Sequence, residues 1–158
     1  MFASLTGSQA SIFYQSQVGD LINSIYVCDW PSGKFTPKGT VVISSAEGAA
    51  RPNPATGLSS VLLGETQGYR VFYHDLNMTI HQLSYAPDVN DGRWAYSGNV
   101  ARDRASGRGI AAGFGKQPNV TIIFPKDAAN MQVTRFNTDK LWHQSEFAPS
   151  HAASAGPD

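Results

Sequence analysis

Residues 11–41 read SIFYQSQVGDLINSIYVCDWPSGKFTPKGTV, and residues 70–100 read RVFYHDLNMTIHQLSYAPDVNDGRWAYSGNV. A shift of 59 residues, from position 11 to position 70, aligns the two stretches without a gap. The matched positions are aromatic residues, aspartates and glycines in one order: Phe13 with Phe72, Tyr14 with Tyr73, Tyr26 with Tyr85, Asp29 with Asp88, Gly33 with Gly92 and Gly39 with Gly98. Self-similarity at a fixed offset is the signature of a repeat architecture, so we expect a repeat fold.

A third and more diverged copy follows the second. A shift of 51 residues places Val71 on Ile122 and Tyr85 on Phe136, and after a three-residue deletion Trp94 meets Trp142. Each copy predicts four short strands, because β-branched and aromatic runs alternate with turn-forming stretches. In the second copy these strands fall near residues 58–63, 69–74, 79–85 and 93–100, and in the third the small-residue strand is 109–114. Small residues suit the crowded innermost strand of a propeller blade.

The predicted fold class is all-β and β-propeller-like. We expect one unit over residues 1–147, with three four-stranded blades at about 2–41, 58–100 and 109–147, and a disordered Ala/Ser/Pro-rich tail at 148–158. Closed propellers typically have about four to eight blades, so three blades leave apolar faces at both ends. We predict that oligomerisation closes the ring, as a homodimer with six blades, and a truncated longer protein is the alternative.

Composition excludes several classes of partner. Only 15% of the 158 residues are charged, and Lys+Arg and Asp+Glu balance at 12 each, which argues against nucleic acid or an anionic membrane surface. The sequence has no basic and apolar leader and no segment able to span a bilayer. We therefore expect a soluble protein without a signal peptide or membrane insertion, either cytoplasmic or released by a non-classical route. The single cysteine, Cys28, is expected to be buried.

Three motifs of the second copy carry a resemblance to a known family. They are Tyr69-Arg70-Val71-Phe72-Tyr73-His74-Asp75, then Ile80-His81-Gln82-Leu83, and Gly92-Arg93-Trp94 through Gly98. This pattern resembles the fungal fucose-specific lectins, which are six-bladed β-propellers. The resemblance implies binding sites between adjacent blades, where an Arg from the second strand and a Glu or Gln from the third bind sugar hydroxyls and aromatic side chains stack on the ring.

Carried over by position, the resemblance makes Arg70 and Gln82 the polar pair of the site. It makes Trp94 and Trp142, which open the fourth strands of neighbouring blades, the stacking candidates. Both tryptophans align with Phe35, so a packing role in the blades is the alternative for them.

The other copies lack the polar pair. Ser11 and Asn23 occupy its positions in the first copy, and Thr121 and Val133 occupy them in the third. We therefore expect at most one site of this type per chain.

The predicted function is a carbohydrate-binding lectin for fucose or a related monosaccharide, with a glycan and a second copy of the chain as partners. The alternative is a non-catalytic propeller scaffold that binds proteins and no sugar. We expect no enzyme, because no acid and nucleophile pair of a glycosidase is identifiable. No cofactor or metal is expected, since the spacing of His74 and His81 places their side chains on opposite faces of an extended chain.

Overall fold

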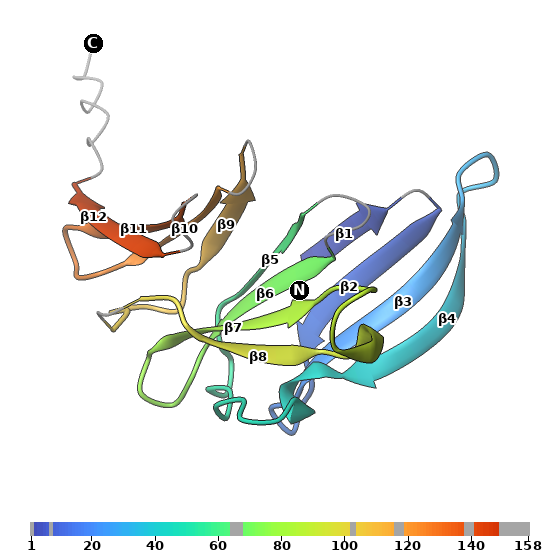
Figure 1. Cartoon of the computed structure of the whole chain (residues 1–158), viewed down its shortest axis with the longest axis horizontal. Coiled ribbons are helices and arrows are strands. Elements are labelled where there is room, and N and C mark those ends of the chain that lie inside the picture. The colour runs from blue at the N-terminus through green and yellow to red at the C-terminus, as the bar shows by residue number, and fades with distance from the viewer. Residues whose placement is uncertain are drawn as a thin grey trace, which may run out of the picture.

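Over the residues that the structure describes, the fold consists of three four-stranded antiparallel sheets (Figure 1). The computed structural model describes residues 2–6, 8–63, 68–101, 104–115, 119–137 and 141–148. Blade 1 contains β1 (Phe2–Thr6), β2 (Gln9–Gln15), β3 (Leu21–Asp29) and β4 (Lys34–Val42). Blade 2 contains β5 (Leu58–Leu62), β6 (Tyr69–His74), β7 (Ile80–Tyr85) and β8 (Ala95–Asn99), and blade 3 contains β9 (Ala111–Phe114), β10 (Val120–Pro125), β11 (Met131–Phe136) and β12 (Trp142–Phe147). The all-β prediction of three four-stranded blades is confirmed.

Within each blade the strands pair in chain order, so each sheet is a simple meander. The repeated glycines explain part of this pattern. Gly33 and Gly92 have φ values of +66° and +65°, in the left-handed region that glycine adopts without a steric penalty. Each lies in the turn that leads into the fourth strand of its blade, and in blade 2 this turn is the 3₁₀ segment η2 (Asn90–Gly92). The repeat therefore conserves a turn geometry as well as an apolar pattern.

The first strands of the blades lie side by side, with β5 next to both β1 and β9. The small residues expected there allow close approach. The Ser59 hydroxyl on β5 accepts a hydrogen bond of 2.9 Å from the backbone N–H of Ala112 on β9. Just before β5, a Cβ placed on Gly57 would lie 1.5 Å from the carbonyl oxygen of Arg108, so no larger residue fits without backbone movement.

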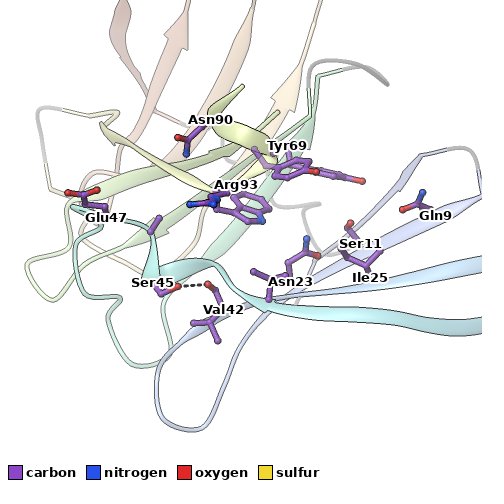
Figure 2. A pocket seen from close by; sticks show the side chains of 15 residues that line it. Gln9, Ser11, Asn23, Ile25, Val42, Ser45, Glu47, Tyr69, Asn90 and Arg93 are labelled. Atoms are coloured by element: carbon purple, nitrogen blue, oxygen red, sulfur yellow. Dashed lines mark hydrogen bonds between the residues drawn. The ribbon is translucent and has the colours of Figure 1, made fainter. Parts of the chain in front are cut away.

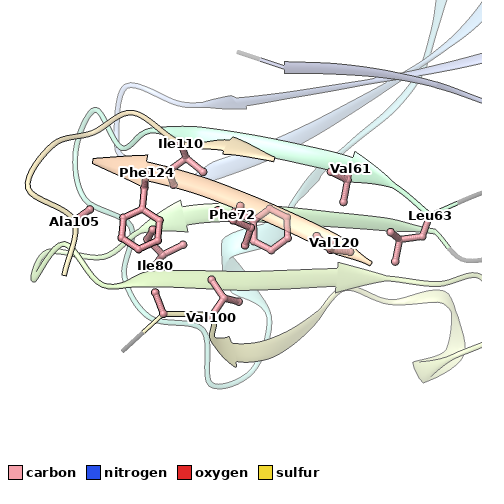
Figure 3. Packing of buried hydrophobic residues seen from close by; sticks show 11 residues of the cluster. Val61, Leu63, Phe72, Ile80, Val100, Ala105, Ile110, Val120 and Phe124 are labelled. Carbon is pink, nitrogen blue, oxygen red and sulfur yellow. The ribbon is translucent and has the colours of Figure 1, made fainter. Parts of the chain in front are cut away.

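Two apolar clusters join the blades. The cluster between blades 2 and 3 is built from both sheets and their connection: Val61, Leu63, Phe72, Ile80, Val100, Ala101, Ala105, Ile110, Val120, Ile122 and Phe124 (Figure 3). The cluster between blades 1 and 2 comprises Phe13, Leu21, Ile43, Leu58, Val71, Tyr73 and Leu83. Side chains alternate between the two faces along a strand, so blade 2 contributes to both clusters: Phe72 and its neighbour Val71 point to opposite faces.

The loop after β4 begins with the 3₁₀ segment η1 (Ile43–Ser45), whose Ile43 is fully buried in the cluster between blades 1 and 2. Cys28 is buried and unpaired by disulfide, as expected. No helix in the described ranges is long and apolar enough to cross a membrane. Of the predicted disordered tail, residues 149–158 lie outside the described residues.

Candidate sugar-binding clefts

The predicted polar pair lies on one face of blade 2. In the register of β6 and β7, Arg70 is opposite Ser84 and Phe72 is opposite Gln82, so Arg70 and Gln82 are diagonal neighbours on the Phe72 face. This face packs on blade 3, because Phe72 belongs to the cluster between these two blades. The structure thus brings Arg70 and Gln82 together at the boundary between blades 2 and 3.

The two predicted tryptophans lie at different boundaries. Trp142 packs against the blade 2–blade 3 cluster and meets Phe72 edge-on, with ring centroids 6.3 Å apart and planes at 90°. Trp94 packs against the other cluster and meets Phe13 edge-on at 5.9 Å and 81°. Trp94 is therefore on the opposite face of blade 2 from Arg70, and only Trp142 shares a boundary with the polar pair.

The Arg70 side chain is half-buried and donates a hydrogen bond of 3.1 Å from Nη1 to the Tyr69 carbonyl oxygen. Burial lowers the pKa of its guanidinium, which nonetheless remains protonated at neutral pH. Gln82 on the adjacent strand is also half-buried. A guanidinium donor and an amide thus stand together at this boundary.

A cavity of about 550 Å³ opens at the same boundary, beside Trp142. It is lined by Thr79, Asn99, Val100, Ala101, Arg104, Trp142 and Gln144. Arg70 and Gln82 lie on the face of blade 2 that packs on blade 3 and are not part of the lining of this cavity. The lining instead includes Arg104, an exposed cation that the repeat alignment did not identify because it follows the fourth strand of blade 2.

The larger cavity, of about 620 Å³, lies between blades 1 and 2 (Figure 2). Blade 1 and the loop after it contribute Gln9, Ser11, Asn23, Ile25, Val41, Val42, Ser45, Ala46 and Glu47, and blade 2 contributes Tyr69, Tyr85, Asn90, Gly92, Arg93 and Trp94. The two cavities are related by the repeat, because Val41, Ser45 and Trp94 align with Val100, Arg104 and Trp142. The boundary between adjacent blades therefore forms a cavity twice, with a tryptophan at the same place.

The sequence did not predict a site between blades 1 and 2, because Ser11 and Asn23 replace the expected polar pair there. The signal it did contain was the aromatic content of the opposing wall. The ring centroids of Tyr85 and Trp94 are 5.6 Å apart, with the ring planes at 37°, and those of Tyr69 and Tyr85 are 6.3 Å apart. Three neighbouring aromatic rings form a surface suited to stacking on the apolar face of a sugar ring.

The two histidines of blade 2 lie on opposite faces of its sheet. His81 Nε2 lies 3.2 Å from Asp75 Oδ2, and its Nδ1 lies 2.8 Å from the Tyr96 hydroxyl oxygen. His74 is fully buried on the other face of the sheet. Among the described residues no group of three or more His, Cys, Asp or Glu side chains is arranged to hold a metal ion.

The three blades in series and the cavities between them define the fold as part of a β-propeller. A variant of Aleuria aurantia lectin in complex with alpha-methyl-L-fucoside superimposes with a TM-score of 0.65 over 96% of this chain, at 17% identity. SapL1 lectin in complex with alpha-methyl fucoside superimposes with a TM-score of 0.63 over 90% of the chain, at 15% identity. The Aleuria aurantia structure described as a six-bladed β-propeller fungal lectin gives 0.59 over 91%, at 20% identity.

The chain spans less than half the length of these structures, covering 45%, 44% and 40% of them respectively. At such identities the similarity establishes the fold, and it confirms the resemblance to the fungal fucose-specific lectins at that level. No protein-family model matches the sequence, and no curated protein is significantly similar to it.

Proposed function

We propose that this protein is a non-catalytic, carbohydrate-binding lectin whose sugar site lies between blades 2 and 3. Arg70, Gln82 and Trp142 are the proposed ligand-binding residues at this boundary. Trp94, the fourth residue of the sequence prediction, is proposed to act at the neighbouring boundary. Fucose or a related monosaccharide is the proposed ligand, since the solved structures to which the chain is similar include complexes with fucosides.

One observation carries this proposal. Of the two inter-blade boundaries that the structure describes, only the one between blades 2 and 3 has an arginine and a glutamine, Arg70 and Gln82, on adjacent strands of the face that packs on the next blade. Trp142 and a cavity lie at the same boundary, although neither Arg70 nor Gln82 lines that cavity. A guanidinium donates to hydroxyl oxygens and an amide both donates and accepts. The indole ring covers the apolar C–H face of a sugar. Together they supply the complementary groups that a monosaccharide requires.

The experiment is a titration of the full chain with alpha-methyl-L-fucoside, followed by a glycan array. Arg70→Ala is expected to weaken binding at least about tenfold, because it removes the only guanidinium of the polar pair. Arg51→Ala serves as the control, since Arg51 is an exposed arginine in the loop between blades 1 and 2 and lines neither cavity. A folded wild-type chain that binds no glycan on the array contradicts the proposal and leaves the interaction scaffold as the function.

We further propose that a second copy of the chain is a partner and closes a six-bladed ring. The outer face of blade 1 carries Tyr14 and Ile22, and the outer face of blade 3 carries Ile123 and Phe147. Phe147 is 43% exposed, so apolar surface remains on the face of blade 3. Native mass spectrometry at micromolar concentration tests this directly: a dimer is expected, and a monomer contradicts it.

A further inference from the structure

His74, at the end of β6, carries a buried imidazole ring without a hydrogen-bond partner. The residue is fully buried, and neither Nδ1 nor Nε2 has a partner among the described residues. The same repeat position holds Gln15 in blade 1, where the amide makes three hydrogen bonds, and Pro125 in blade 3. The repeat therefore folds without a titratable group at this position, and blade 2 alone has one.

The His74 ring lies on the face of blade 2 that packs on blade 3. Side chains alternate along β6, so His74 shares its face with Phe72, which belongs to the cluster between these two blades (Figure 3). A Cβ placed on Gly57 would lie 3.2 Å from His74 Cε1 and 1.5 Å from the carbonyl oxygen of Arg108. Because Arg108 belongs to the connection that leads into β9, His74 is tightly packed where the chain enters blade 3.

The nearest carboxylate is already engaged by other donors. Asp75 Oδ2 lies 3.2 Å from His81 Nε2, and Asp75 Oδ1 accepts hydrogen bonds from the backbone N–H groups of Asn77 and Thr79. Burial lowers the pKa of His74 to about 4, with smaller contributions from Arg108 and His81, although the charge of Asp75 opposes the shift. The docked blades thus favour the neutral ring.

The other charged groups on the two facing sheets do not offer an acceptor for a protonated ring. Arg70, on the same face of β6, is a further cation. On the facing sheet of blade 3, the register places Gln132 and Glu146 opposite each other. Glu146 is exposed and forms an ion pair with Lys126. An imidazolium at His74 would therefore be buried among cations and neutral groups.

We propose that His74 makes the boundary between blades 2 and 3 acid-sensitive, so that protonation of its ring favours separation of blade 3 from blade 2 while blades 1 and 2 stay packed. An imidazolium has two N–H donors, and burial without acceptors penalises both of them and the charge. Separation returns the ring to water. Because Arg70, Gln82 and Trp142 lie at this boundary, acid also weakens the sugar site, a consequence that rests on the proposed function.

Amide hydrogen exchange of the full chain at pH 7.5 and pH 4.5 measures this separation locally. The N–H of Ala112 donates to Ser59 Oγ across the boundary between blades 2 and 3, whereas the N–H of Leu21 donates to Ser44 Oγ within blade 1 and the loop after it. The ring is neutral in both states above pH 6.5, and acid favours the separated state as the pH falls towards 4. The protection factor of Ala112 should fall at least about tenfold, and that of Leu21 less than about twofold.

Two variants remove the titratable ring. His74→Gln introduces the residue of blade 1, and His74→Leu replaces the unpartnered ring by an apolar group, which keeps the test decisive if one variant does not fold. Each should reduce the acid-induced loss of Ala112 protection to less than about twofold. His143→Gln, at an exposed histidine of β12, is the matched control and should retain the full loss.

Three outcomes overturn the inference: Ala112 protection that is equal at the two pH values, a loss that persists in the folded His74 variants, or an equal loss at Leu21, which would indicate global unfolding. A further sample contains saturating alpha-methyl-L-fucoside at pH 4.5. A ligand that binds the docked blades should raise Ala112 protection by mass action. Protection that the fucoside leaves unchanged at both pH values contradicts the proposed function and leaves the acid-induced separation standing.

Discussion

The two boundaries between blades share their packing and differ in their polar groups. At each boundary a fully buried phenylalanine of one blade meets a tryptophan of the next edge-on, Phe13 with Trp94 at 5.9 Å and Phe72 with Trp142 at 6.3 Å. The arginine and glutamine beside Phe72 are replaced by serine and asparagine beside Phe13. The repeat therefore preserves the contact that joins blades and varies the groups that would recognise a ligand.

A second difference lies at the ends of the second strands. His74 at the end of β6 corresponds to Gln15 at the end of β2. Gln15 donates two hydrogen bonds of 2.9 Å, to the carbonyls of Gly19 and Asn53, and accepts one of 3.2 Å from the Thr56 N–H. Both ring nitrogens of His74 are buried without a partner among the described residues. The polar atoms at this position are therefore hydrogen-bonded in blade 1 and have no hydrogen-bond partner among the described residues in blade 2.

The shared packing predicts the largest effect. Phe72→Ala and Phe13→Ala should each lower the free energy of unfolding by about 3–5 kcal/mol, because each opens a cavity at a fully buried aromatic position. Urea denaturation of both variants measures this. Val18→Ala, at a position that is 81% exposed, should change stability by less than about 0.5 kcal/mol.

Equal losses of unfolding free energy in Phe72→Ala and Phe13→Ala would support the conclusion that the two boundaries between blades are packed in the same way. A loss for Phe13→Ala below about 1 kcal/mol would contradict the comparison, because it would mean that blade 1 packs on blade 2 without depending on this contact.

The polar difference predicts a pH effect at the boundary between blades 2 and 3. Burial, with smaller contributions from nearby Arg108 and His81, lowers the pKa of His74 from 6.5 to about 4, although Asp75 opposes the shift. The folded state thus favours the neutral ring. The contribution of the neutral His74 ring to the free energy of unfolding is complete above pH 6.5 and is lost as the pH falls towards 4. The difference corresponds to about 3 kcal/mol of stability.

The measurement is the free energy of unfolding between pH 7.5 and pH 4. His74→Gln, which introduces the residue found in blade 1, should flatten this dependence, and His143→Gln at an exposed histidine of β12 should leave it unchanged. An unaltered acid dependence in His74→Gln would show that the loss of stability arises elsewhere.

The architecture was predictable because it depends on repeated local patterns. The predicted strand at 69–74 is β6 as found, and those at 58–63, 79–85 and 93–100 differ from β5, β7 and β8 by one or two residues at their ends. The register that places Arg70 and Gln82 on one face follows from their spacing across a hairpin. These features require only strand alternation and turn residues, which a single sequence displays.

The cavities were harder to predict because they join residues from different blades and loops. Asn23, Arg93 and Glu47 share one cavity through the packing of blade 1 on blade 2, which no local pattern encodes. The separation of Trp94 from Arg70 has the same origin. Both residues belong to blade 2, and the face that each occupies decides which neighbouring blade it meets. Placing them correctly required the order of the blades in space.

The smallest predicted effect concerns the innermost strands. Ser59→Ala removes the acceptor for the Ala112 N–H and should lower the free energy of unfolding by about 1 kcal/mol. Ser60→Ala on the same strand is the matched control, because Ser60 lies on the opposite face of β5. Amide hydrogen exchange adds a local measure: Ala112 should exchange faster in Ser59→Ala and not in Ser60→Ala. Unchanged protection of Ala112 would mean that apolar packing alone holds β9 against β5, and that blade 3 docks on blade 2 without this hydrogen bond.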